Sequence, residues 1–356
     1  DEDPNVQSAA VLDAGAEITA GQEESLAHRY CTECIVTGHD VDRRHLREEL
    51  AVLGSSLVVA GLHDKVRVHV HVNDPAEVFR IATRYGTVSA EKADDMQRQQ
   101  HSAHLTGRQV AVVTDSAADI PDDEMDRLGI HMVPVRLHFG AHSYLDKVGI
   151  TSEEFYAELQ RNPEHPKTSQ PPPGDFRRQF EFLASHYPSV LSLNLSRQVS
   201  GTCGAAETAA TRVTTHGKVR VVDSMNASVG QGLLAMYAAE CAERGWPLER
   251  IVPAVEAMRS RTLTFGLVGS LEYGVRGGRL PRWVKSVADA LQLMPILHAD
   301  RRGRVTGGGV LFGRHRLREK FARFVRRRMR ATTRYRVLVG HANCASDGEW
   351  LLGQLQ

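Results

Sequence analysis

Two histidines on one predicted strand are the first residues whose types and spacing suggest chemistry. The stretch RVHVHVND places His69 and His71 two residues apart, so both imidazoles project from the same face of a β-strand. Cys31, in RYCTEC, belongs to the same part of the chain, and one thiolate with two imidazoles is a donor set that Zn²⁺ accepts. Two interpretations stay open: a zinc site on these three residues, or a solvent-facing strand beside an unrelated cysteine.

Hydroxyl-bearing side chains near the ends of predicted strands form a second candidate set. They are Thr114-Asp115-Ser116, Thr168-Ser169-Gln170, Ser196 and Ser200-Gly201-Thr202. Such hydroxyls, with free backbone N–H groups at helix starts, can bind a carboxylate or a phosphate. One cluster alone is typical of a helix cap or a turn, but several at equivalent strand ends favour an anion site. Ser200 lies outside any G-x-S-x-G pattern, and the glycine-rich stretches lack a P-loop lysine, so a serine hydrolase or a nucleotide site has weak support.

A strongly basic segment, residues 314–336, is the third candidate. It holds eleven Arg or Lys residues against one Glu. Its apolar residues fall at helical spacing and predict a buried stripe under a cationic outer face: Leu317, Phe321, Phe324, Val325 and Met329. The outer face is either solvated or a docking surface for an acidic domain, a phosphate, an anionic membrane or nucleic acid.

Length and composition set the frame for these sites. The 356 residues, 42% of them hydrophobic, predict a soluble protein of two or more domains, and a net charge of +1 gives no overall attraction to nucleic acid or membrane. Five scattered cysteines indicate a reducing, cytoplasmic setting. Residues 1–28 are acidic and read as a linker or frayed terminus.

The elements that must position the candidates change in kind along the chain. Residues 29–104 predict a small α+β domain, with a helix over 45–54, a hairpin over 56–72 and a helix over 74–86 capped by Asp74. The polar run 94–109 predicts a domain boundary. In residues 105–356, apolar strands that end in polar turns alternate with helices, which predicts an α/β domain with a parallel sheet. Residues from about 263 onward predict a second lobe.

Six stretches of this second part, taken in order, resemble the DegV family of fatty-acid-binding proteins. They are VVTDSAADIP (112–121), KTSQPPPGDF (167–176), LSRQVSGT (195–202), VVDSMNASVGQG (221–232), LEYGVRGGRL (271–280) and LMPIL (293–297). The resemblance implies a two-lobed α/β fold that buries an acyl chain between its lobes and holds the carboxylate with hydroxyl groups.

By that resemblance, Thr168 and Ser200 bind the fatty-acid carboxylate. Ser169 and the amides of Gly201 and Thr202 assist them. The hydrophobic chain itself lies between the lobes, where the family buries it.

The resemblance also places Asp115, Ser116, Arg279 and Arg314 near the head group or the surface that docks a kinase. One departure concerns the His-x-Gly-Pro-Gly segment, whose histidine completes the family's carboxylate site and which is absent from this sequence. His341 occupies a different strand-end position and is no substitute for it. We expect either a chain cut short at its carboxyl end or an incomplete site.

The first hundred residues resemble the middle domain of bacterial fatty acid kinase, a relative of dihydroxyacetone kinase. The matching stretches are RYCTECIV, the run from Leu46 to Gly86, and ADDMQRQQ. In that family the cysteine and the two histidines are a metal-binding set, so Cys31, His69 and His71 would hold a structural Zn²⁺. The middle domain also implies a homodimer.

These resemblances together predict one part of a fused fatty acid kinase system. The chain would take a long-chain fatty acid from a membrane surface and present its carboxylate for phosphorylation to acyl phosphate, a step toward phospholipid. A nucleotide-binding kinase domain, upstream or in trans, would supply ATP and Mg²⁺. The alternatives are a zinc-dependent hydrolase centred on Cys31, His69 and His71, and a regulatory module that binds nucleic acid through residues 314–336; the first is the runner-up, and no nucleic-acid partner is expected.

Overall fold

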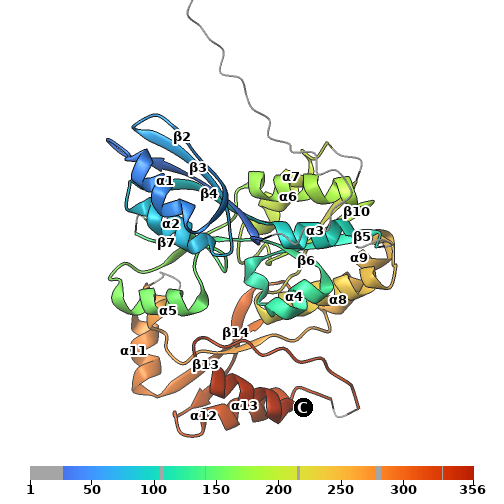
Figure 1. The fold of residues 1–356 in the computed structure, drawn as a ribbon. Coiled ribbons are helices and arrows are strands. Elements are labelled where there is room, and N and C mark those ends of the chain that lie inside the picture. The colour runs from blue at the N-terminus through green and yellow to red at the C-terminus, as the bar shows by residue number, and fades with distance from the viewer. Residues whose placement is uncertain (1–26, 105–107, 141, 215–216, 277–281, 331) are drawn as a thin grey trace, which may run out of the picture.

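The amino-terminal part of the chain folds around a four-stranded antiparallel sheet. The structure, a computed structural model, describes residues 27–356 except 105–107, 141, 215–216, 277–281 and 331 (Figure 1). Sheet order is β2-β3-β1-β4, built from β1 (Tyr30–Thr37), β2 (Gly54–Gly61), β3 (Lys65–Val72) and β4 (Thr87–Asp95). Strand β3 alternates valine with polar residues, so its valines are buried on one face and its histidines occupy the other.

Two helices cover the apolar face of this sheet. They are α1 (Arg43–Ala51) and α2 (Pro75–Thr83), whose first turns are capped by the carboxylates of Asp42 and Asp74. Leu46, Leu50 and Val78 pack with the strand valines in a single core. The predicted hairpin and both predicted helices are therefore present. Helices α1 and α2 both lie on the apolar face of the sheet, opposite the face that carries the histidines.

The polar run 94–109 contains more structure than its composition suggests. Strand β4 continues to Asp95, and helix α3 (Met96–His104) follows directly. Met, Gln and Arg favour helix, and Arg98 is buried because Asp95 and Asp126 pair with its guanidinium. Polarity here reflects ion pairs between elements. We call residues 27–104 the N-terminal unit and residues 108–356 the main unit.

A parallel sheet forms the centre of the main unit, as the strand and helix alternation predicts. Its order is β11-β10-β5-β6, from β5 (Val110–Asp115), β6 (Ile130–Val133), β10 (Ser189–Asn194) and β11 (Lys218–Asp223). Two apolar cores lie on its two faces. Helices α6 (Pro173–His186) and α7 (Thr202–Ala210) cover one face, and α4 (Asp122–Leu128), α8 (Val229–Glu243) and α9 (Leu248–Arg259) the other. A 3₁₀ turn, η1 (Ser116–Ala118), follows β5.

A second, smaller sheet joins the two units. Its order is β8-β7-β9, from β7 (Arg136–Phe139), β8 (His142–Leu145) and β9 (Lys167–Ser169), and α5 (Ser152–Arg161) follows β8. Leu145 of β8 is buried in the core of the N-terminal unit. In Figure 1 the blue N-terminal unit accordingly lies directly against β7. We call β8-β7-β9 the joining sheet.

The carboxyl-terminal lobe is a third layer, orange to red in Figure 1. It contains β12 (Phe265–Leu267), β13 (Leu293–Ala299), β14 (Val305–Phe312), α10 (Glu272–Arg276), α11 (Arg282–Ala290), α12 (Leu317–Arg326) and α13 (Ala345–Leu355). The predicted basic helix is present but ends at Arg326, and Phe321 is buried on its inner side. None of the described helices is both long and apolar enough to cross a membrane.

Candidate functional site

Two of the predicted hydroxyl clusters, Thr168-Ser169-Gln170 and Ser200-Gly201-Thr202, lie near each other, although they come from different sheets. Thr168 and Ser169 end β9 of the joining sheet, whereas Ser200 and Gly201 form the turn between β10 and α7. The contact is close: a Cβ atom on Gly201 would lie 1.9 Å from Oε1 of Gln170, the residue after Ser169. Glycine at this position leaves room for the Gln170 side chain against the start of α7.

The start of helix α7 gives this place the properties of an anion site. Gly201 caps the helix, and the Thr202 amide donates to Ser200 Oγ at 3.3 Å. The hydroxyls of Ser200 and Thr202 are 2.9 Å apart, and Ser200 is only half-buried. The partial positive charge at a helix start adds to these donors. Hydroxyls beside a helix start are groups that can bind an anion.

Asp115 and Ser116 have a structural role, because their side chains bind backbone amides of neighbouring segments. Both are buried, and the Asp115 carboxylate accepts hydrogen bonds from the amides of Leu195 and Ala117 at 2.7 and 3.0 Å. Burial raises the pKa of Asp115, and the hydrogen bonds oppose that rise. Ser116 Oγ accepts from the Val135 amide at 3.0 Å. These side chains fix the strand ends that carry the hydroxyl turn.

Ser196, the remaining hydroxyl predicted at a strand end, connects the central sheet to the carboxyl-terminal lobe. It is buried, and its hydroxyl donates to the Gly303 carbonyl at 2.7 Å. Gly303 has φ +78° in the turn between β13 and β14, and a Cβ there would lie 2.4 Å from Ser196 Oγ. This hydroxyl joins the lobes and is not directed at a ligand.

An open hollow separates the central sheet from the carboxyl-terminal lobe. Apolar residues line both of its sides: Ile120, Leu234 and Tyr237 on one, and Leu297, Phe321 and Leu351 on the other. Arg314 is exposed at its edge. Among the described lining residues, none belongs to the hydroxyl clusters. Arg279, the other predicted basic residue, lies outside the described residues.

The structure brings Cys31, His69 and His71 together on the polar face of the N-terminal sheet. In the register of β1 and β3, Cys31 is opposite His71 and Glu33 is opposite His69. One ligand atom from each of Cys31, His69 and His71 lies within 4.8 Å of the other two, and Cys31 Sγ is 3.8 Å from His69 Nδ1. These are three donors that suit Zn²⁺, gathered as one site.

Protonation at this cluster favours metal binding at one ligand and opposes it at another. Burial lowers the pKa of His71, with a contribution from His69, which favours the neutral imidazole that binds metals. Burial, followed by the charge of Asp94, raises the pKa of Cys31 to about 11, so the free thiol is protonated at neutral pH. Zinc binding there would release a proton. Glu33 Oε1 lies 3.3 Å from His69 Nδ1 and can orient that ring.

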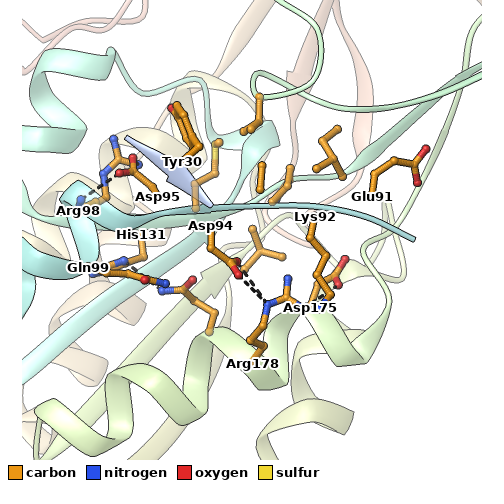
Figure 2. Close-up of a pocket in the computed structure, with 17 residues that line it drawn as sticks. Tyr30, Glu91, Lys92, Asp94, Asp95, Arg98, Gln99, His131, Asp175 and Arg178 are labelled. Carbon is orange, nitrogen blue, oxygen red and sulfur yellow. Dashed lines mark hydrogen bonds and ion pairs between the residues drawn. The ribbon is translucent and has the colours of Figure 1, made fainter. Parts of the chain in front are cut away.

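The sequence did not predict the ion pairs that connect the two units. Figure 2 shows the small pocket where β4 meets the main unit, with Asp94 of β4 reaching Arg178 of α6 at 3.3 Å. Arg136 of β7 contacts both Glu91 of β4 and Asp175 of α6. The signal that could have revealed them is the charged sequence EKADD at the end of β4. Because this sequence is polar, its last residues were counted as part of the predicted domain boundary.

Two family models together cover most of the described chain. One, described as "Uncharacterised protein, DegV family", matches residues 109–356. The other, the FakA-like middle domain of fatty acid kinase, matches residues 27–103. Both resemblances seen in the sequence are confirmed.

Relatives of known identity agree with the larger match. Protein DegV of Bacillus subtilis is 34% identical over 194 residues, which are 54% of this chain and 69% of that protein. A solved structure described as DegV, a fatty acid binding protein from Bacillus subtilis, is similar with a TM-score of 0.61 at 30% identity, over 70% of this chain and 88% of that one. A DegV family protein from Thermus thermophilus, described by its fatty acid binding, gives a TM-score of 0.54 at 34% identity, over 62% and 77% of the two chains. These relatives confirm the fold and give no support to the hydrolase or the nucleic-acid hypothesis.

Proposed function

The chain belongs to the DegV family, and we propose that it binds a long-chain fatty acid by its carboxylate at the two hydroxyl clusters. The observation that supports this proposal is the contact of Gln170, the residue after β9, with Gly201 at the start of α7, which brings the chain segments that carry the two hydroxyl clusters near each other. Hydrogen bonds from hydroxyls to an ionised carboxylate are about twice as strong as those between neutral groups. Fatty acid binding in the two solved relatives supports the same ligand class.

The acyl chain would extend toward the hollow between the lobes. Its apolar sides come from α8 and the segment after η1 on the central sheet, and from β13, α12 and α13 on the carboxyl-terminal lobe. Removing a hydrocarbon chain from water contributes about 0.8 kcal/mol for each buried CH₂. The chain therefore supplies most of the affinity, and the hydroxyls select the carboxylate.

Denaturing extraction of the purified protein, followed by lipid mass spectrometry and palmitate titration, tests the proposal. We expect bound long-chain acid in the wild type and roughly tenfold weaker palmitate binding in Thr168→Val and in Ser200→Ala. Matched controls are Thr208→Val and Ser185→Ala, which remove exposed hydroxyls bonded only to nearby groups of their own helices. Absence of any long-chain acid and of palmitate binding would refute the proposal.

The bound carboxylate would then be presented for phosphorylation to acyl phosphate. The support for this finer role is the kinase middle domain match in residues 27–103 and its direct contact with the lipid-binding unit. The phosphoryl donor, ATP with Mg²⁺, would come with a nucleotide-binding kinase domain in cis or in trans. Incubation with such a domain, ATP and palmitate should give acyl phosphate, detected as a hydroxamate; intact palmitate after full ATP turnover would contradict this role.

A structural Zn²⁺ on Cys31, His69 and His71 is a second proposal for the N-terminal unit. The grouping of the three ligand atoms within 4.8 Å favours it. We expect about one zinc per chain in the wild type and almost none in Cys31→Ala. The control is Cys344→Ala, which removes an exposed cysteine at the start of α13 in the carboxyl-terminal lobe. Equal zinc content in both variants would contradict the assignment.

A further inference from the structure

The two halves of the proposed carboxylate site are anchored to different sheets. Ser200 and Thr202 belong to the central parallel sheet through β10 and α7. Thr168 and Ser169 belong to the joining sheet, where β9 pairs only with β7 in the strand order. The distance between the two halves therefore depends on how the joining sheet is seated.

Strand β7 holds β9 at every paired position. Backbone partners are Arg136 with Ser169, Leu137 with Thr168, and His138 with Lys167. His138 Nε2 also lies 2.9 Å from Ser169 Oγ. A displacement of β7 would thus move the hydroxyl pair with it.

Arg136, the first residue of β7, is bonded to both units at once. Its guanidinium donates to Glu91 Oε2 at 3.2 Å and to the Glu91 carbonyl at 3.3 Å, both on β4 of the N-terminal unit. It also donates to Asp175 Oδ2 at 3.1 Å, in the first turn of α6. The side chains of Arg136, Glu91 and Asp175 are 16%, 5% and 14% exposed. A planar guanidinium suits this three-way contact, and little water reaches it to replace a lost partner.

A second ion pair supports the same contact from a position three residues further along β4. Asp94 of β4 accepts from Arg178 of α6 at 3.3 Å, as Figure 2 shows. Arg178 Nη1 lies 3.6 Å from Asp175 Oδ1, so the two ion pairs share the first turn of α6. The N-terminal unit therefore contacts both the joining sheet and α6 through ion pairs.

We propose that Arg136 is a positioning residue for the fatty-acid carboxylate: by tying β7 to Glu91 and Asp175, it sets Thr168 and Ser169 opposite Ser200. Docking of the N-terminal unit is then part of the lipid site, although that unit contributes no ligand-contacting side chain. This inference rests on the proposed carboxylate site and adds the residue that aligns its halves.

The test compares two ligands that differ only at the head group, palmitate and methyl palmitate, on the full chain. In Arg136→Gln we expect palmitate affinity to fall about tenfold while methyl palmitate affinity changes by less than about twofold, because only the ionised carboxylate depends on charge-assisted, well-aligned hydrogen bonds. Glu91→Gln breaks the same contact from the other unit and should reproduce this ligand selectivity. Agreement of the two variants would support the proposal even where one of them folds poorly.

The matched control is Arg177→Gln, on the same helix as Asp175. Arg177 pairs with Glu181 one turn away on the surface of that helix, and this variant should bind both ligands like the wild type. Equal losses for palmitate and methyl palmitate in Arg136→Gln would show a general packing role and overturn the inference, as would unchanged binding of both. If the wild type binds methyl palmitate and palmitate equally, the carboxylate site itself is wrong, which is a separate result.

Discussion

Asp115 shows how one buried carboxylate organises the strand ends next to the turn that carries Ser200. Its two oxygens accept from the amides of Leu195 and Ala117, one on the chain after β10 and one in η1. Asp115→Asn would place an NH₂ group against one of these N–H groups and leave a buried donor without an acceptor. We expect the free energy of unfolding to fall by about 2–3 kcal/mol, measured by urea titration.

A comparison with Asp123→Asn controls for the loss of a negative charge, because Asp123 is an exposed residue of the first turn of α4. That variant should change the free energy of unfolding by less than about 0.5 kcal/mol. An Asp115→Asn protein as stable as the wild type would mean that the two amide bonds contribute little.

Individual residues were predictable where their neighbours are set by local geometry. The side chains of His69 and His71 had to share a face of one strand, and Cys31 then needed only a neighbouring strand in the right register. Arg136 could not be found this way. Its partners Glu91 and Asp175 are 45 and 39 residues distant in the chain, on a strand and a helix whose relative placement no local pattern encodes.

At the scale of elements, helix α8 can reach the η1 turn only because of Gly232. A Cβ at this position would lie 2.2 Å from the Ala118 carbonyl oxygen, and backbone cannot move aside as a flexible side chain can. We expect Gly232→Ala to lower the free energy of unfolding by about 1–3 kcal/mol, since the helix must shift away from the sheet. Thermal and urea unfolding would measure it.

Gly204, in helix α7, provides the opposite case. No atom outside its immediate neighbourhood lies within 4 Å of a Cβ built there. Gly204→Ala should therefore raise the free energy of unfolding by about 0.5–1 kcal/mol through helix propensity alone. Equal effects of the two substitutions would refute the close-approach argument.

Helix α11 carries an apolar stripe that faces solvent. Three apolar residues follow one another at intervals of four: Trp283 and Val287 in α11, and Leu291 just after its last residue. Their exposed fractions are 68%, 46% and 60%. If the chain takes its proposed ligand from a membrane, such a stripe is suited to the bilayer interface. Trp283→Asp should reduce sedimentation with anionic phospholipid vesicles several-fold while leaving soluble palmitate binding unchanged.

The control for this helix is Val52→Asp, because Val52 is 83% exposed at the end of α1 on the N-terminal unit. It adds the same charge at a site without an apolar stripe, and vesicle binding should remain at the wild-type level. If both variants sediment alike, α11 is not the membrane contact.

Elements with strong periodicity were largely predictable, and those held by distant partners were not. The valine alternation of β3 and the capped start of α2 appear in the fold as predicted. Helix α3 was missed because its Arg98 is buried by pairing with Asp126 of the main unit, a contact that no local pattern shows. The basic helix was predicted too long because arginines continue past Arg326 without packing that would extend the helix. The sequence shows where charged residues occur, but it does not show which of them form ion pairs.

At the scale of the whole molecule, the two units are held together by ion pairs as well as by the shared core. Asp126 of α4 lies between two arginines of the N-terminal unit, accepting from Arg98 Nε at 3.1 Å and from Arg29 Nη2 at 3.1 Å. Burial acts to raise the pKa of Asp126, but its hydrogen bond and charge pairing with Arg98, together with Arg29, outweigh burial and hold that pKa below its usual value.

A carboxyl whose pKa is lower in the folded protein stabilises it only while it is ionised. The contribution of Asp126 is therefore complete above its unfolded pKa of about 4 and is lost as the pH falls through the lower, folded value. As the pH falls from about 4 toward 3, we expect the amide protection factors of α3 and β4 to fall, since the N-terminal unit loosens when Asp126 is protonated. Protection factors are compared because the intrinsic exchange rate itself falls over this pH range. Asp126→Asn, which cannot ionise, should show low protection factors already at about pH 5 and less further change on acidification. An identical pH response in variant and wild type would assign the loosening to other carboxylates.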